Sequence, residues 1–270
     1  MRNNDLAIKT SSSHIAVSIS TRDLLAYLNA TLTPEKYKDY CPNGLQVEGR
    51  GEVNKIVTGV TASMALLEAA KAQNADALLV HHGYFWRGEA PEIVGIKQKR
   101  IKFLLENDIN LLAYHLPLDA HVEFGNNVQF GRLLGLKIDS WVGESNIVAL
   151  GTLNTPKVLA ELCRDIEVAL QRKPQVICSM GGDLAQLVNR IAWCTGAAQN
   201  YMELAIANNV DVFISGEISE QTVHLARESG VAYIAAGHHA TERYGVQALG
   251  EHLAQKFGLE HVFIDGDNPV

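Results

Sequence analysis

Three short, largely apolar runs, each followed at once by histidine or acidic residues, constrain the fold of this 270-residue chain most strongly. The runs span residues 75–80, 109–114 and 231–236. Apolar runs of this length are typical of parallel strands that are buried on both faces. Open α/β sheets bind their ligands at the carboxyl ends of such strands, so we expect the polar residues after each run to gather at one site. The sequence therefore predicts an α/β fold.

The chain can bury a full core in one large or two small domains, because 47% of its residues are hydrophobic. Its formal charge of -7, with lysine and arginine dispersed, makes nucleic acid an unlikely partner. No apolar run approaches the length of a membrane span, and the four cysteines form no Cys-x-x-Cys pair. We therefore expect a cytoplasmic protein without membrane association that acts on a small-molecule substrate.

A strand, turn, helix and strand pattern occurs twice. Five residues between Asn54 and Asp76 match five between Asn189 and Asp211, and the offset is 135 positions at both ends of the match (189 − 54 and 211 − 76). A repeat of this length, half of the chain, indicates two homologous α/β lobes with mostly parallel strands.

The repeat divides the chain into four segments. Residues 1–19 form a loose N-terminal tail, and residues 20–136 form the first α/β lobe. Residues 137–187 form a linker and a small β-α-β insertion, and residues 188–270 form the second α/β lobe. Since the polar strand ends come from both lobes, we expect a metal site between them.

Five residues at the strand ends suit metal binding, and they are His81, His82, Asp119, His238 and Glu242. His238 and Glu242 stand four residues apart, so on a helix they can converge on one ion. Histidine and glutamate at this spacing more commonly interact only with each other on a solvated helix surface. Nitrogen and oxygen ligands together suit zinc, iron, manganese or nickel. Five ligands are too many for one catalytic ion with open positions, so we predict two divalent ions, with Glu242 as the bridge and a candidate catalytic residue.

Other polar residues near these strand ends have more than one interpretation. Glu217 is a second candidate catalytic residue, as a general base, but it could also hold a ligand in place or cap the following helix. His115 could orient a ligand or face the substrate. Asn43 could contact substrate or simply form a turn with the glycine after it. We expect His121 and His239 to be structural, because adjacent side chains diverge.

Three consecutive aromatic residues, Tyr84–Trp86, follow the histidine pair. They cannot all turn inward, so at least one is expected to be exposed on an isolated subunit and to serve an interface or a ligand groove. The alternative is a lid over the metal pocket, with Trp86 lining it. The turn at Thr195–Ala197 could receive a phosphate, or it could be a plain strand-to-helix turn.

Four segments, Pro42–Val47, His81–Trp86, His115–Asp119 and Gly237–Glu242, resemble the signature blocks of the YbgI-like proteins. These dinuclear-metal proteins are catalogued as GTP cyclohydrolase I type 2 homologs and are also called Nif-three-like. The resemblance covers about residues 20–270. It implies a two-lobed subunit, a dimetal site in which the five residues are the ligands, and a toroidal homohexamer built as a trimer of dimers.

The resemblance also implies a hydrolase that acts on a purine nucleotide or on a related ring or phosphoester. A non-catalytic metal-handling or metal-dependent assembly protein is the alternative. This chain has Gly83 where many relatives have proline, and Leu116-Pro117 where many have Thr-Asn. These departures affect the lining of the pocket rather than the ligands, so they bear on the choice of substrate.

Overall fold

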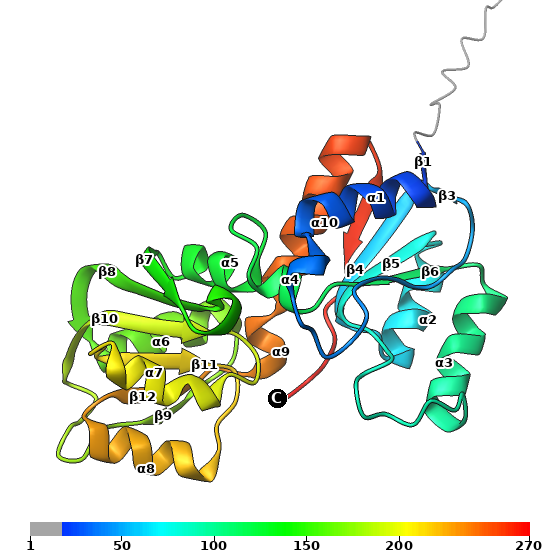
Figure 1. The fold of residues 1–270 in the computed structure, drawn as a ribbon. Helices are drawn as coiled ribbons and strands as arrows, with labels where there is room; N and C mark the ends of the chain where they lie inside the picture. The colour runs from blue at the N-terminus through cyan, green and yellow to red at the C-terminus, as the bar shows by residue number, and fades with distance from the viewer. Residues whose placement is uncertain (1–17) are drawn as a thin grey trace, which may run out of the picture.

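The computed structural model describes residues 18–270, which form two α/β lobes side by side (Figure 1). The fold is mixed α/β, as predicted. Most of the expected N-terminal tail lies outside the described residues. Ile19, the last residue of that tail, and Ser20 form β1 (Ile19–Ser20), which pairs with β3 (Glu52–Val53) at the edge of the first lobe.

The first lobe is built on a five-stranded sheet. Its order is β13 (Glu260–Phe263), β4 (Lys55–Thr61), β5 (Ala77–His82), β6 (Asn110–Ala113) and β2 (Gly44–Val47). The first four strands are parallel and β2 is antiparallel to β6. Parallel strands of this kind are buried on both faces, which explains their continuous apolar sequences.

Two pairs of helices cover the two faces of this sheet. On one face lie α1 (Thr21–Leu32) and α10 (Arg243–Phe257), and on the other lie α2 (Met64–Ala72) and α3 (Gly95–Glu106). The sequence explains α1 well: the Ser20 side chain accepts a hydrogen bond from the amide of Asp23, and Leu24, Leu28 and Leu32 recur every four residues and are fully buried.

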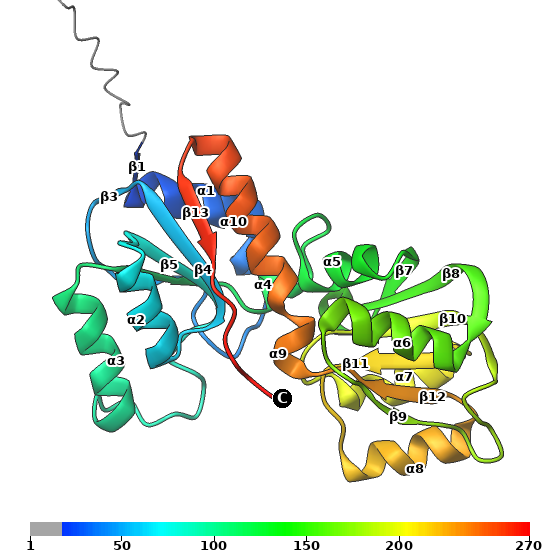
Figure 2. The same cartoon turned by 180° about the vertical axis from the view of Figure 1, so that it is seen from behind.

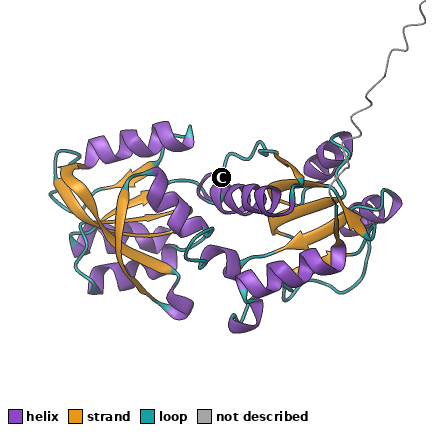
Figure 3. Ribbon diagram, turned by 90° about the horizontal axis from the view of Figure 1, so that it is seen from above, coloured by secondary structure: helices purple, strands orange, loops and turns teal. Residues whose placement is uncertain are grey.

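The second lobe is built on a six-stranded sheet. Its order is β7 (Leu136–Val142), β8 (Val148–Val158), β10 (Leu187–Cys194), β11 (Val212–Ser215), β12 (Ala232–Ala235) and β9 (Gln175–Ile177). Helices α5 (Asn126–Leu133) and α6 (Leu159–Leu170) pack on one face, and α7 (Met202–Ala207) and α8 (Glu220–Ser229) pack on the other. Figure 3 shows both sheets between their helices.

The short elements lie mainly in the connections. They are α4 (Leu116–Asp119), α9 (His238–Thr241) and the 3-10 turns η1 (Pro34–Lys36), η2 (Glu144–Asn146) and η3 (Gln199–Tyr201). Helices α9 and α10 carry the chain from the second lobe back to the first (Figure 2). Among residues 18–270, no helix is both long and apolar enough to cross a membrane.

The structure differs from the predicted segments in two places. Segment 137–187 does not stand apart, because its strands form both edges of the six-stranded sheet, where β8 pairs with β10 and β9 pairs with β12. The added strands are antiparallel, so the prediction of mostly parallel strands fits the first sheet but not the second. The last helix and strand belong to the first sheet rather than to the second lobe, because β13 pairs with β4.

The sequence repeat has a local structural counterpart. The carboxylate of Asp76 accepts hydrogen bonds from the amides of Asn54 and Lys55, and that of Asp211 does the same for Asn189 and Arg190. Each aspartate thus ties the start of one strand to the start of the next. This agreement supports the repeat, and the common origin of the two lobes stays a prediction.

Candidate metal centre

The five residues singled out in the sequence come together at the junction of the lobes. His81 and His82 end β5, Asp119 ends α4, His238 begins α9 and Glu242 links α9 to α10. The Nε2 atom of His81 lies 3.4 Å from a carboxylate oxygen of Asp119 and 3.4 Å from Oε1 of Glu242. Oε2 of Glu242 lies 3.3 Å from Nε2 of His82 and 3.1 Å from Nε2 of His238.

These distances define two groups of candidate ligands that share Glu242. One group is His81, Asp119 and Glu242, and the other is His82, His238 and Glu242. Within each group the ligand atoms lie within 4.8 Å of one another. Imidazole and carboxylate together are the donor set that zinc and similar divalent ions prefer in proteins. The residues therefore form clusters that could bind a metal ion.

Each of the three histidines is held by its second ring nitrogen. Nε2 faces the cluster in every case, and Nδ1 contacts a polar atom of a neighbouring segment. For His81, His82 and His238 in turn, these atoms are the carbonyl of Tyr114 at 3.0 Å, the hydroxyl of Thr61 at 3.2 Å and a carboxylate oxygen of Glu217 at 2.7 Å. Such contacts fix the ring orientation of metal-binding histidines in known sites.

The charges of the cluster are strongly coupled. Burial would lower the pKa of His81, but the carboxylates of Asp119 and Glu242 raise it to about 10. Burial alone would also lower the pKa of His238, which the neighbouring carboxylates of Glu242 and Glu217 raise to about 9. Burial lowers the pKa of His82 to about 3 against the pull of Glu242. The two carboxylates thus favour the protonated form of His81 and His238 but not of His82.

Glu242 provides a direct test of whether a metal ion fits. Its side chain is 4% exposed, and its Oε2 atom faces the Nε2 atoms of His238 and His82 at 3.1 and 3.3 Å with no aligned hydrogen-bond donor among residues 18–270. Burial would raise the pKa of this carboxyl, but the neighbouring histidines lower it well below its usual value. A buried carboxylate oxygen without a partner is costly, whereas a cation between it and two imidazole nitrogens would satisfy it. The residues present therefore fit a divalent ion.

Gly196 allows the carboxylate of Glu242 to lie where it does. Its backbone has φ of +69°, and an added Cβ would collide with Oε1 of Glu242 and lie 3.3 Å from Nε2 of His238. Only glycine combines this left-handed conformation with so close an approach at little cost. Its carbonyl also accepts hydrogen bonds from the amides of Gly216 and Glu217, which join the ends of β10 and β11.

Sequence reasoning missed Asn126, which is fully buried at the start of α5. Its amide nitrogen donates to Asp119 at 2.8 Å, and its amide oxygen accepts from the backbone of Gly245 in α10 at 2.9 Å. Asn126 therefore holds a candidate ligand and links it to the helix that follows Glu242. The only signal in the sequence was the pair Asn126-Asn127 at the start of an apolar helix.

Asp39 was also missed, because it precedes a segment that was interpreted only as a turn. Its carboxylate accepts hydrogen bonds from Nδ1 of His115 at 2.7 Å, the amide of Leu116 at 2.9 Å and the side chain of Asn43 at 2.8 Å. The side chain of Asn43 also accepts from the backbone of His115. Asn43 therefore holds the loop around His115, and the His115 ring lies 5.1 Å from that of His81.

The remaining predicted residues occupy distinct places. Glu217 contacts His238 and makes no helix cap. The ring of Trp86 lies edge-on to that of His115, with 5.0 Å between their centroids. Tyr84 is buried, whereas Phe85 and Trp86 are half-buried, so the exposed aromatic residue stays a prediction. His239 turns away from the cluster and pairs with Asp265 at 2.8 Å.

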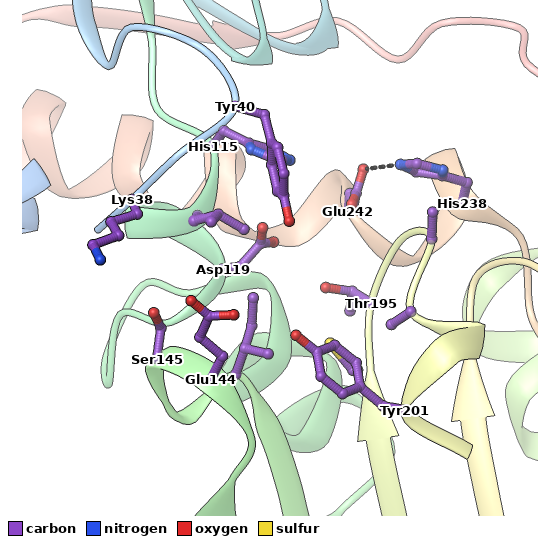
Figure 4. Close-up of a pocket in the computed structure, with 15 residues that line it drawn as sticks. Lys38, Tyr40, His115, Asp119, Glu144, Ser145, Thr195, Tyr201, His238 and Glu242 are labelled. Atoms are coloured by element: carbon purple, nitrogen blue, oxygen red, sulfur yellow. Dashed lines mark ion pairs between the residues drawn. The ribbon is translucent and has the colours of Figure 1, made fainter. Parts of the chain in front are cut away.

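A cavity of about 340 Å³ opens beside the cluster, between the two lobes (Figure 4). Asp119, His238 and Glu242 line its inner end. Its volume suits a small molecule rather than a polymer. The cluster is therefore open to a ligand on one side.

The buried imidazoles and carboxylates at a lobe junction define a candidate metal-binding α/β protein. The chain belongs to the family Duf34/NIF3 (NGG1p interacting factor 3), whose model matches residues 19–269. This confirms the resemblance stated from the signature blocks.

Individual relatives agree with this assignment. A Pseudomonas aeruginosa protein called GTP cyclohydrolase 1 type 2 homolog is 55% identical over 259 residues, which cover 95% of this chain and 99% of the relative. The solved structure of protein ybgI, described as of unknown function, is 50% identical with a TM-score of 0.89, over 93% of this chain and all of that one. A solved structure from Thermus thermophilus is 34% identical with a TM-score of 0.83 over the same shares.

Proposed function

We propose that this protein is a dinuclear metal-dependent hydrolase. The observation that carries the proposal is the pair of ligand groups sharing one buried carboxylate, Glu242. His81, Asp119 and Glu242 would hold one ion, and His82, His238 and Glu242 the other. Zinc, iron, manganese and nickel all suit this donor set.

Two divalent ions held by these residues would supply Lewis acidity and activate water for hydrolysis at neutral pH. The chain's own residues prepare the site for this chemistry. Asp119 and Glu242 compensate the positive charge, and Glu217 fixes the ring of His238 through Nδ1. Because Glu217 is committed to that contact, we assign it an orienting role in preference to that of a general base.

We propose that the substrate is a purine nucleotide or a related ring or phosphoester. Support comes from the relatives called GTP cyclohydrolase 1 type 2 homolog, which cover nearly the whole chain, and from the cavity that leads to the cluster. The rings of Trp86 and His115 meet edge to face beside the histidine pair. They would border the substrate on the side of the first lobe.

Metal analysis and a substrate panel test this function. Purified protein should carry close to two ions per chain, and Glu242→Ala should lose both, because the shared carboxylate belongs to both groups. Glu251→Ala, which removes an exposed carboxylate from the following helix, is the matched control and should keep both ions. GTP, damaged nucleotides and phosphoesters should then be assayed with the metal-loaded protein and with both variants.

The same panel separates the hydrolase from a metal-handling protein. The nearly complete burial of His81, Asp119 and Glu242 also suits a protein that stores or transfers metal. Full occupancy without turnover of any compound would favour that second function. Full occupancy in Glu242→Ala would remove the basis of both.

We further propose a homohexamer, a toroid formed as a trimer of dimers, in the cytoplasm. Exposed apolar side chains around the start of α3, among them Ile93, Val94 and Ile96, support an assembly, since such surface usually marks an interface. The four cysteines are all free, which suits a reducing compartment. Light scattering that gives the mass of one chain at all concentrations would refute the hexamer.

A further inference from the structure

The cavity beside the cluster contains a buried hydroxyl without a partner. Thr195, at the end of β10, is 7% exposed, and its Oγ1 atom has no hydrogen-bond partner among residues 18–270. The residue lines the cavity, and its hydroxyl points into the space between the lobes (Figure 4). A buried hydroxyl left unpaired costs free energy, and a polar ligand atom in the cavity would satisfy it.

Two further hydroxyls face the same space. Tyr40 reaches the cavity from the first lobe and Tyr201 from η3 of the second, and their phenol oxygens both point inward (Figure 4). Neither phenol has a hydrogen-bond partner within the part of the chain that the structure describes. The cavity therefore offers a set of neutral donors and acceptors drawn from both lobes.

Apolar side chains fill the wall between these polar groups. Leu116 lines it on the first lobe, and Ile147 and Ala198 line it on the second. Apolar walls combined with polar groups at particular points suit a ligand with apolar faces and a polar edge. A flat nitrogen heterocycle has this character, whereas a sugar presents hydroxyls in all directions.

The charges of the lining argue against a polyphosphate as the group recognised there. Lys38 is the single lysine or arginine among the described residues of the lining, and the carboxylate of Glu144 lies on the same side of the cavity. Phosphate sites normally use several arginines, lysines or backbone amides. A carboxylate instead accepts hydrogen bonds from ring N–H and amino groups.

We propose that this cavity binds the neutral nitrogen heterocycle of a nucleoside-sized ligand, with Thr195, Tyr201 and Glu144 contacting its polar edge. The inference rests on the proposed hydrolase function, because the heterocycle would be the part of the substrate that faces the metal ligands. Any phosphate groups of the ligand then lie outside this set of contacts.

Calorimetric titration of the metal-loaded full chain with guanosine, adenosine, GTP and ribose 5-phosphate tests the proposal. At least one nucleoside should bind more tightly than ribose 5-phosphate, and GTP should bind at least as tightly as guanosine, because it carries the same ring. If neither nucleoside binds, or if ribose 5-phosphate binds as tightly as the nucleosides, the proposal is overturned.

Thr195→Val provides the variant test, because it removes the hydroxyl and nearly preserves the shape. Nucleoside affinity should fall about tenfold, metal content should stay unchanged, and the melting temperature should not fall, since the unpaired hydroxyl contributes nothing to the free chain. Thr155→Val, at an exposed position of β8, is the matched control and should behave as wild type. Unchanged affinity in Thr195→Val would contradict the proposal.

The outcome also separates this inference from the proposed function. Nucleoside binding that depends on Thr195, without turnover of any compound, would refute the hydrolase and keep the heterocycle site. Turnover of a simple phosphoester with no nucleoside binding would keep the hydrolase and refute the heterocycle site.

Discussion

Replacing Gly196 by alanine should weaken metal binding without unfolding the second lobe. The change acts in two ways. Alanine in the left-handed conformation at φ of +69° costs about 1 kcal/mol. The new Cβ also collides with the carboxylate of Glu242 and lies 3.1 Å from its Cδ atom. Relief of an overpacked contact of this kind costs about 1–3 kcal/mol.

The carboxylate cannot move without loss to the candidate ligand set. Glu242 lies within 3.1–3.4 Å of His238, His82 and His81, so displacement of one oxygen disturbs both groups of ligands. Disturbed positioning of ligands typically costs 10–100-fold in metal affinity, which is about 1.4–2.7 kcal/mol. We therefore expect a loss of this size for Gly196→Ala.

Competition with a chromophoric chelator gives the metal affinity, and urea unfolding of the metal-free chain gives the stability. Gly135→Ala is the matched control, because Gly135 has φ of +65° and open space around an added Cβ. It should lose about 1 kcal/mol of stability and no metal affinity. If Gly196→Ala binds metal as tightly as the control, the packing argument for the Glu242 carboxylate is wrong.

Four other predictions follow from the contacts of the site. Asp265→Asn should lower metal affinity about threefold to tenfold in the chelator assay, because Asp265 holds His239 and Arg243, which directly follow the candidate ligands His238 and Glu242. Burial would raise the pKa of Asp39, but His115 and hydrogen bonds lower it. The stabilising contribution of this carboxylate is therefore present at neutral pH and is lost as the pH falls through its lowered pKa. The difference in stability between wild type and Asp39→Asn, measured by urea unfolding, should therefore shrink in acid. Light scattering of Trp86→Ala should find the assembly unchanged, since this ring is partly buried beside the histidines. Removal of metal by chelation should speed amide hydrogen exchange in α4 and α9 while the central strands stay protected.

The candidate ligands were predictable because their positions follow from strand periodicity. A buried parallel strand ends where its apolar run ends, so the histidines after Val80 had to lie at the carboxyl edge of a sheet. The same reasoning placed His238 after β12. The residues that support the ligands were not predictable in this way, because Asn126 and Asp39 reach the site through loops whose paths depend on tertiary packing.

The segment boundaries failed for a different physical reason. The short strand Glu260–Phe263 has two polar residues followed by two apolar ones, a pattern that assigns it to neither sheet, and α10 has an apolar stripe that could cover a face of either sheet. Only tertiary contacts decide between them. Helix α10 packs with α1 and with the strands of the first sheet through Val246, Leu249 and Leu253. This places the strand after α10, β13, beside the edge of β4, where the two strands pair.

The return of the chain from the second lobe to the first, which the predicted boundaries missed, also brings the candidate ligands together. His238 stands where the chain leaves the second sheet, and Glu242 stands four residues later, where α10 begins its path along the first sheet. His81 and His82 meet them from the first sheet itself. Had the last helix and strand stayed with the second lobe, Glu242 would have had no structural reason to face β5. The shared carboxylate therefore depends on the return of the chain to the first lobe, and an ion bound through it would hold the two lobes in register.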